Sequence, residues 1–263
     1  MKLLRTIAVR ALVGLAVGGL GFLLVLPVVS LLIRTSPGEL LTRLGRPEIQ
    51  QALLLSLETS LLATALVLLL GLPAAYLMAS RQFPGKRIVE VLFDLPMVIP
   101  PTVAGLILLL TFGRAGLLGK SLGLWGVSLP FTTAAVVVAQ AFMAAPFFLG
   151  PVRAGFTTVE HRYREVAATL GAGEFYSFVR VMLPLSLPSV LAGTAMACAR
   201  ALGEFGATIT FAGNLPGVTQ TMPLAVYVEM QHDLGAAITL SVLLIMLSFG
   251  LLLALRYGQS RVP

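Results

Sequence analysis

Long stretches with few or no charged side chains dominate this chain, and short polar or basic segments separate them. Each stretch is near or above the roughly 20 residues that an α-helix needs to cross the hydrocarbon core of a bilayer. The pattern predicts an all-α integral membrane protein, in which residues 1–263 form one transmembrane domain with six spans at about 11–33, 57–80, 95–113, 131–152, 185–212 and 234–256. The third and fifth spans are rich in proline.

The composition supports a membrane protein. Hydrophobic residues make up 57% of the chain, charged residues make up 11%, and the mean hydropathy is +0.96. A soluble domain of this length could not bury so much apolar surface. The first apolar run follows Lys2, Arg5 and Arg10, as in a signal peptide, but it is longer than a signal core and lacks an obvious cleavage site. We therefore expect it to be retained as the first span.

The distribution of basic residues indicates the orientation in the membrane. The N-terminus, the 81–87 turn, the 153–180 segment and the C-terminal tail hold twelve Lys and Arg residues, whereas the alternate loops hold five. Because basic loops tend to stay in the cytoplasm, both termini and the 153–184 segment are expected to be cytoplasmic. The net charge of +7 then reflects topology and contact with the lipid bilayer, and no nucleic-acid partner is expected.

Few residues are suited to catalysis or to metal binding. Cys198 is the single cysteine and lies in an apolar stretch, while His161 and His232 fall on opposite sides of the membrane in this topology. A glycine-rich phosphate loop followed by Lys-Ser or Lys-Thr is absent from the sequence. We therefore expect a chain that is not an enzyme and has no cofactor or metal of its own. If ATP is used, another subunit binds it.

The 153–184 segment is polar and charged, although it lies between two apolar spans. A helix is expected to begin near Thr157 or Thr158 and to end at Gly171, since glycine permits a turn that residues with a Cβ resist. Ala167 and Ala168 would let a partner surface approach the backbone closely. An ordinary interfacial helix, anchored by aromatic and arginine side chains, is the alternative.

The spacing of this segment resembles the EAA signature of bacterial type I ABC importer permeases, with Val166 and Val181 as conservative departures. In that family the segment is the coupling helix that docks on a cytoplasmic ATPase. The resemblance implies that the coupling residues are Glu165, Ala167, Ala168, Gly171, Leu183 and Pro184. It also implies a homodimer in a prokaryotic plasma membrane, two ABC ATPase subunits that bind ATP and Mg²⁺, and an extracytoplasmic oxyanion-binding protein.

Two other segments narrow the resemblance. Residues 94–119 read DLPMVIPPTVAGLILLLTFGRAGLLG, and residues 199–227 read ARALGEFGATITFAGNLPGVTQTMPLAVY. Together they are similar to permeases for molybdate, tungstate and sulfate, and residues 199–227 most resemble those for molybdate. The implied function is a molybdate or tungstate permease that works by alternating access. Sulfate permeases carry a similar LGEFGA and GN-PG pattern, so a sulfate or thiosulfate permease is the alternative.

Two ionisable residues, Arg200 and Glu204, interrupt the apolar fifth span. Their i, i+4 spacing predicts that they pair on one helical face, either as part of the translocation path or gate or as a structural ion pair, and in both cases away from lipid. Neighbouring glycines would allow close packing or bending, and threonine hydroxyls could contact an anion, although they more often bond their own backbone. These further path or gate candidates are Gly203, Gly206, Thr102 and Thr208.

Two outward loops, residues 114–130 and 213–233, offer a platform for a soluble partner. The 213–233 loop is polar and is bounded by Pro216 and Pro223, so a solvated connector is the simpler alternative. The residues expected to contact the binding protein are Trp125, Asn214, Thr219, Gln220 and Thr221.

Three other classes of protein fit the sequence less well than a permease does. A proton- or sodium-coupled carrier should have more midplane carboxylates than Glu204 and an internal repeat. A membrane enzyme would need clustered catalytic residues, which the sequence lacks. A membrane scaffold would not need the coupling motif.

Overall fold

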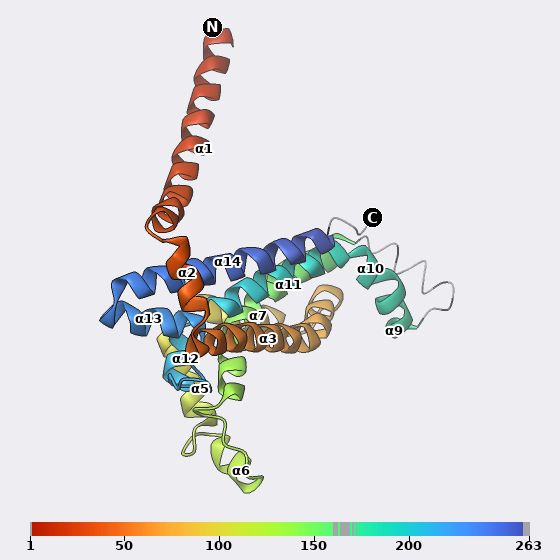
Figure 1. Cartoon of the computed structure of the whole chain (residues 1–263). Coiled ribbons are helices and arrows are strands. Elements are labelled where there is room, and N and C mark those ends of the chain that lie inside the picture. Colours follow the sequence, from red (N-terminus) through yellow and green to blue (C-terminus); the bar gives the residue numbers. More distant parts are fainter. Residues whose placement is uncertain (1, 160–162, 164–168, 170, 172, 260–263) are drawn as a thin grey trace.

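The structure is a computed structural model that describes residues 2–159, 163, 169, 171 and 173–259 (Figure 1). Every regular element within these residues is a helix, so the predicted all-α fold is confirmed. Among the described residues, four helices are long and apolar enough to cross a membrane, and the number rises to six if two bent helix pairs each form one span. The four are α1 (Lys2–Ile33), α3 (Pro47–Ser80), α7 (Thr133–Thr158) and α14 (Leu234–Gln259).

The first bent pair occupies the region of the predicted third span. Here α4 (Lys86–Asp94) and the 3-10 turn η1 (Leu95–Met97) meet α5 (Pro101–Phe112) at an angle of 115°. Pro100 has a ψ of 135° and Pro101 lies in the first turn of α5. A proline at that position leaves no unsatisfied N–H, because the first turn has no intrahelical acceptor. Residues 95–113 are therefore a bend followed by a short helix, and not one continuous helix.

The second bent pair precedes the predicted fifth span. The chain passes through α9 (Glu174–Ser177), the π-helical turn η2 (Phe178–Met182) and α10 (Leu183–Leu185), and then bends by 75° into α11 (Leu187–Leu202). α11 ends at Leu202, and α12 (Gly206–Phe211) begins after a break of residues 203–205. The predicted span at 185–212 is thus two helices with a break inside it.

α7 is the central helix of the bundle. Its fully buried Ala144 and Phe148 pack against α3 and α11, where Ala63 and Ala197 are also fully buried. Its Ala139 belongs to a second cluster that α7 shares with α5 and α12. Small side chains at these contacts let the helices approach closely, which is how membrane helices gain van der Waals contact.

The region 213–233, which the sequence predicts to be an outward loop, contains a helix. α13 (Met222–His232) packs against α3 and α14 through Met222 and Ala225. The N–H of Met222 donates a hydrogen bond of 2.7 Å to Oγ of Ser56 on α3. These tertiary contacts bury apolar side chains of a segment whose sequence is typical of a solvated loop.

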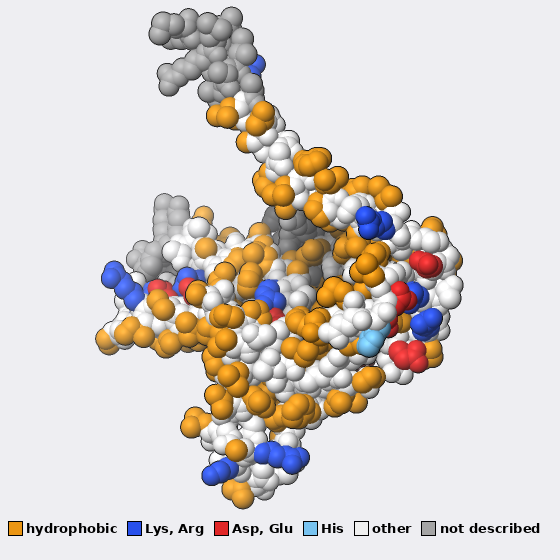
Figure 2. Space-filling view, turned by 90° about the vertical axis from the view of Figure 1, so that its left-hand side faces the viewer, with side chains coloured by type: hydrophobic (Ala, Val, Ile, Leu, Met, Phe, Trp, Pro, Cys, Tyr) orange, Lys and Arg blue, Asp and Glu red, His pale blue; other side chains and the backbone are white. Residues whose placement is uncertain are grey.

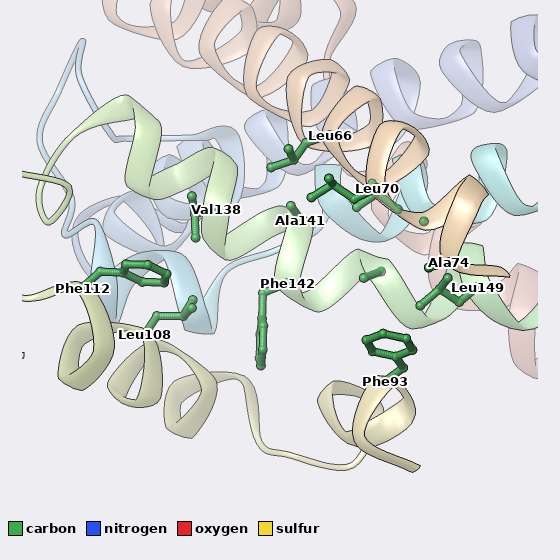
Figure 3. A pocket seen from close by; sticks show the side chains of 13 residues that line it. Leu66, Leu70, Ala74, Phe93, Leu108, Phe112, Val138, Ala141, Phe142 and Leu149 are labelled. Atoms are coloured by element: carbon green, nitrogen blue, oxygen red, sulfur yellow. The ribbon is translucent and has the colours of Figure 1, made fainter. Parts of the chain in front are cut away.

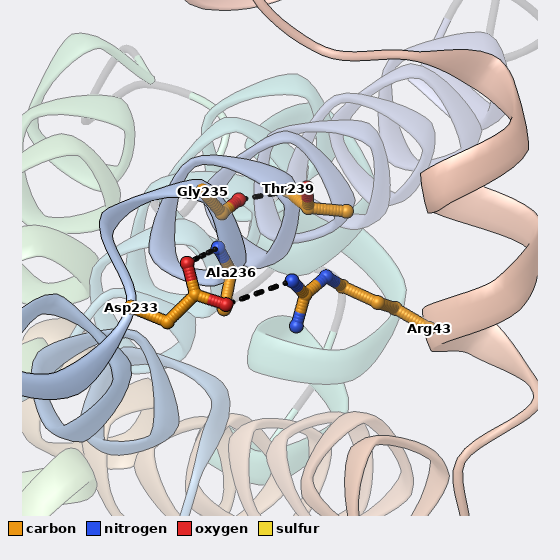
Figure 4. A network of polar contacts seen from close by, with 5 residues as sticks. All are labelled: Arg43, Asp233, Gly235, Ala236 and Thr239. Atoms are coloured by element: carbon orange, nitrogen blue, oxygen red, sulfur yellow. Dashed lines mark hydrogen bonds and ion pairs between the residues drawn. The ribbon is translucent and has the colours of Figure 1, made fainter.

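An ion pair connects the short helix α2 (Pro37–Leu44) to the start of α14 (Figure 4). Nη2 of Arg43 lies 3.1 Å from Oδ2 of Asp233, and Oδ1 of Asp233 accepts the N–H of Ala236 at 3.1 Å. The Ala236 N–H and then the Arg43 guanidinium lower the pKa of Asp233. The carboxylate therefore stays charged at neutral pH and holds both contacts.

α1 and the hairpin that carries α6 (Gly119–Leu124) project away from the other helices (Figure 1). None of the candidate span in α1 is buried within the chain. Hydrophobic side chains also cover much of the face of the molecule shown in Figure 2. An exposed apolar surface of this extent fits burial in lipid or against another subunit.

The contact between α5 and α12 is the basis of a stability prediction. A Cβ at Gly105 would lie 2.6 Å from Cβ of Thr210 and 2.7 Å from the carbonyl oxygen of Ala207. Because backbone cannot yield as a flexible side chain does, Gly105→Ala should lower the free energy of unfolding by about 1–3 kcal/mol. The matched control is Gly150→Ala, since no atom lies within 4 Å of its added Cβ. Thermal unfolding in detergent measures both variants, and equal melting temperatures would contradict the close contact.

Candidate functional site

An ion pair lies at the break between α11 and α12. Nη2 of Arg200 is 2.6 Å from Oε2 of Glu204, and the Glu204 side chain is 1% exposed. Oε1 of Glu204 accepts the N–H of Ala207 at 2.8 Å. The predicted pairing of Arg200 and Glu204 is confirmed. The two residues do not lie on one face of a continuous helix, however, because α11 ends at Leu202 and the ion pair bridges the break.

Glu204 stabilises the break in two ways. Its charge offsets that of Arg200, which matters because an unpaired buried charge is strongly unfavourable. Its second oxygen caps the first turn of α12, whose N–H groups lack intrahelical acceptors. The Arg200 side chain is 23% exposed, and its guanidinium lies 5.9 Å from the centre of the Phe147 ring, within range of a cation–π contact. The burial of Glu204 keeps this carboxylate away from lipid, as predicted.

The two broken spans meet at their breaks. A Cβ at Gly206, the first residue of α12, would lie 2.7 Å from Cβ of Pro101 and 3.1 Å from the backbone nitrogen of Thr102. Gly206 therefore permits the close approach that was expected of it. Gly203 caps the end of α11 with a φ of −87°, so this turn does not require a left-handed backbone. The starts of α5 and α12 and the Arg200–Glu204 pair form one site, which we call the break site.

The threonines of α5 and α12 differ in their hydrogen bonding. Thr111 and Thr210 donate to carbonyls of the preceding helical turn, which is the usual arrangement in membrane helices. Thr208 is fully buried, and its hydroxyl has no hydrogen-bond partner among the residues that the structure describes. Thr102 is exposed at the start of α5. Thr208, and not the two threonines that bond their own helix, therefore keeps a buried hydroxyl that is not committed to a described partner.

Gln140 of α7 is a further polar residue that the sequence analysis does not single out. It is fully buried, and neither atom of its amide has a hydrogen-bond partner within the described part of the chain. Burying an amide without a partner costs about 1–3 kcal/mol, so such a residue needs an explanation. The signal in the sequence is a lone amide within the apolar stretch of α7.

A cavity of about 350 Å³ lies among α3, α4, α5 and α7 (Figure 3). The side chains in view, which include Phe93, Phe112 and Phe142, are all hydrophobic. Such a wall has no hydrogen-bond donor or cation for an anion, whose desolvation would not be compensated there. This cavity is therefore not a candidate path for a charged substrate.

The predicted coupling residues fall in a region that the structure describes only in part. Glu165, Ala167 and Ala168 lie outside the described residues. Gly171 has a φ of +81°, in the left-handed region, so the turn expected there is present. Leu183 and Pro184 are in α10, just before the bend into α11. The Gly171 turn and the bend before α11 thus lie in the part of the 153–184 segment that leads back to the membrane spans.

Aromatic rings attach the end of the coupling segment, by which we mean the part of the predicted 153–184 segment that follows α7, to the bundle. The ring centre of Phe178 in η2 lies 4.6 Å from that of Tyr76 on α3 and 6.0 Å from that of Phe156 on α7. Tyr76 and Phe156 also meet edge to face at 5.7 Å. Arg81 and Glu174 add an exposed ion pair between the end of α3 and α9. The coupling segment is therefore in direct contact with α3 and α7.

The residues expected to contact the binding protein differ in their exposure. Trp125 is 83% exposed on the projecting hairpin, and Asn214 and Gln220 are half-buried. Thr219 and Thr221 are fully buried, and Oγ1 of Thr219 accepts the N–H of Leu215 at 2.9 Å. The expectation that these two threonines are open to a soluble partner is therefore wrong, because the chain itself covers them.

Comparisons with known proteins agree with this fold. Residues 68–259 match the family described as the binding-protein-dependent transport system inner membrane component. A bacterial ABC transporter that imports the acidic polysaccharide alginate has a chain with a TM-score of 0.76 at 14% identity, covering 99% of this chain and 98% of that one. A likeness at this identity supports the fold alone.

Curated relatives are closer in sequence. The molybdenum transport system permease protein ModB of Mycobacterium tuberculosis is 42% identical over 233 residues, which cover 89% of this chain and 88% of that protein. ModB of Escherichia coli K12 is 42% identical over 186 residues, covering 70% of this chain and 81% of that protein. The sulfate transport system permease protein CysW of Synechococcus elongatus is 35% identical over 262 residues, covering 96% and 92%.

The helical bundle with its two broken spans is thus a multi-pass membrane permease of the ABC importer class. The chain belongs to the family of binding-protein-dependent transport system inner membrane components. It is the inner membrane component of a transport system that depends on a binding protein.

The break site yields a test of the buried ion pair. Arg200→Met leaves the buried Glu204 carboxylate unpaired and should cost about 3–5 kcal/mol of stability. The double variant Arg200→Met/Glu204→Gln removes both charges and keeps an oxygen for the Ala207 N–H, so it should be clearly more stable than Arg200→Met alone. Melting temperatures in detergent measure the difference. A double variant no more stable than Arg200→Met would mean that the two charges do not depend on each other.

Proposed function

We propose that this chain is the permease of a molybdate importer and also accepts tungstate. The observation that carries the proposal is the 42% identity over 233 residues to a protein named as a molybdenum transport permease. The break site fits a conduit that receives its anion from a partner. It offers threonine hydroxyls and one paired arginine, but no cluster of free cations among its described residues. Selectivity would then reside mainly in the binding protein.

A sulfate permease is the second candidate. It is supported by the 35% identity to CysW, which extends over 96% of this chain. Sulfate, molybdate and tungstate are all tetrahedral dianions, so the same hydroxyl and amide donors suit each of them. The higher identity to the molybdenum permeases favours molybdate.

The working unit in this proposal is a homodimer with the path between two copies and both termini in the cytoplasm. The apolar surface of α1 and of the body would be covered by lipid and by the second copy. Binding of ATP by the two ATPases would draw the coupling segments together. Because η2 contacts α3 and α7, and α10 bends directly into α11, this movement would reach the break site and alternate its access.

The binding protein would meet the permease on the outward side. Of the residues expected at this contact, Trp125 is the most exposed, while Asn214 and Gln220 remain partly accessible. Leu117 and Leu124 of the same projecting hairpin are 85% and 89% exposed. An exposed apolar tip with a tryptophan is suited to docking on a soluble protein.

Transport of labelled anions tests the substrate. The permease, reconstituted with its ATPase and a molybdate-binding partner, should move molybdate and tungstate at rates within roughly a few-fold, because hydroxyl and amide contacts distinguish anions of nearly equal size poorly. Omission of ATP is the control. Uptake of sulfate without detectable uptake of molybdate, under a cognate partner for each anion, would exclude the molybdate proposal and leave the permease class intact.

The Gly171 turn tests the coupling segment. Gly171→Val places a β-branched residue at a φ of +81°, at a cost of at least about 1–2 kcal/mol, and should disturb ATPase docking while the protein stays in the membrane. Gly173→Val is the matched control, because Gly173 has a φ of −65° and, like Gly171, has no atom of the described residues within 4 Å of an added Cβ. Uptake and co-purification of the ATPase are the measurements. Normal uptake and normal co-purification of the ATPase in Gly171→Val would contradict a role for this turn in coupling.

A further inference from the structure

Arg153 of α7 bridges two carboxylates of α4. Its Nη1 lies 3.6 Å from Oε1 of Glu90, and its Nη2 lies 3.9 Å from Oδ2 of Asp94. Glu90 and Asp94 are four residues apart and therefore share one face of α4. The side chains of Arg153 and Glu90 are each 28% exposed and that of Asp94 is 45% exposed. One guanidinium thus holds both acidic side chains of α4 against the end of α7.

Apolar contacts also tie α4 and η1 to the bundle. Val89 packs against the central core and Phe93 lines the apolar cavity, whereas Ile88, Val91 and Leu92, on the other face of α4, are 67%, 65% and 57% exposed. The exposed residues suit contact with lipid or with a second subunit, so they do not fix α4 on α7. The ion pairs with Arg153 are therefore the polar part of the contact between these two helices.

Arg153 connects two parts of the protein that have separate roles. Towards the C-terminus, α7 ends at Thr158 and leads into the coupling segment. α4 leads through η1 and Pro100 into α5, which contacts α12 at Gly105 and Gly206. The Arg153 guanidinium is thus the polar contact on the route from the coupling segment through α4 to the break site, beside the apolar contacts of α4 and η1 with the bundle.

We propose that Arg153 is a positioning residue that couples movement of the coupling segment to the third span. This inference rests on the proposed function, since it concerns how ATP hydrolysis on a partner is converted into access at the break site. Arg153 need not touch the anion. It keeps α4 and α7 together as one rigid unit, so that displacement of the end of α7 also displaces α5 and, with it, α12.

The test is the ratio of anion transported to ATP hydrolysed in reconstituted vesicles. Arg153→Gln should lower this ratio roughly tenfold, the size of a typical coupling between two sites, while ATP hydrolysis falls far less than uptake. Arg43→Gln is the matched control, because it removes an arginine–carboxylate pair that joins two other helices, α2 and α14. Its ratio should equal that of the wild type. A ratio for Arg153→Gln equal to that of the control would overturn the proposal.

Charge reversal separates coupling from simple loss of structure. Arg153→Glu should uncouple transport, and Arg153→Glu/Glu90→Arg should restore a large part of the ratio by re-forming the pair in the opposite sense. Failure of this rescue, with both proteins folded and bound to the ATPase, would contradict an electrostatic contact.

A second measurement does not depend on transport. Spin labels at Val91 of α4 and Thr157 of α7, both exposed, should give a narrow distance distribution in the wild-type background and a broad one with Arg153→Gln. An unchanged distribution would overturn the role of Arg153. If the wild-type complex moves neither molybdate, tungstate nor sulfate, the proposed function fails, and the spin-label result still decides whether Arg153 fixes α4.

Discussion

The interior of a bilayer contains no water to satisfy a free N–H, a carbonyl or a charge, yet two of the candidate spans of this protein contain a break in the helix. At the break between α11 and α12, the single carboxylate of Glu204 neutralises Arg200 with one oxygen and caps α12 with the other. At the start of α5, Pro101 lies in the first turn, where an amide would have no intrahelical acceptor. The polar groups at the two breaks are thus accounted for in two different ways, by a side-chain carboxylate at one and by a proline at the other.

The arrangement of the breaks depends on residues that have almost no side chain. Gly105 and Gly206 bring the backbones of α5 and α12 into contact, so each broken helix covers part of the other. Beside this contact, Leu108 and Phe112 of α5 line the apolar cavity shared with α3 and α7. The α5 backbone is therefore closely packed on α12, whereas an apolar cavity without polar contacts lies between α5 and α3. α5 is therefore held more firmly to α12 than to α3.

Much of this architecture could be predicted from the sequence, because it follows from local pattern. Apolar runs predicted the all-helical fold, and the spacing of Arg200 and Glu204 predicted their pairing. The end of α11 at Leu202 could not be predicted in the same way, since it depends on the capping of α12 and on its contact with α5. The burial of Thr219 and Thr221 was missed for a similar reason. Polar residues near prolines are typical of solvated loops, and here it is the packing of α13 against α3 and α14 that covers them.

The isolation of α1 has a consequence for assembly. Because none of its candidate span is buried in its own chain, the packing free energy of the central bundle does not include it. Insertion of α1 into the bilayer and its association with neighbouring helices are therefore separable events. The hydrophobicity of α1 determines the first event, and only the second requires a matching surface. Selection on α1 then acts on its length and apolar character, and on whichever molecules surround it in the membrane, more than on the fold of the subunit that it begins.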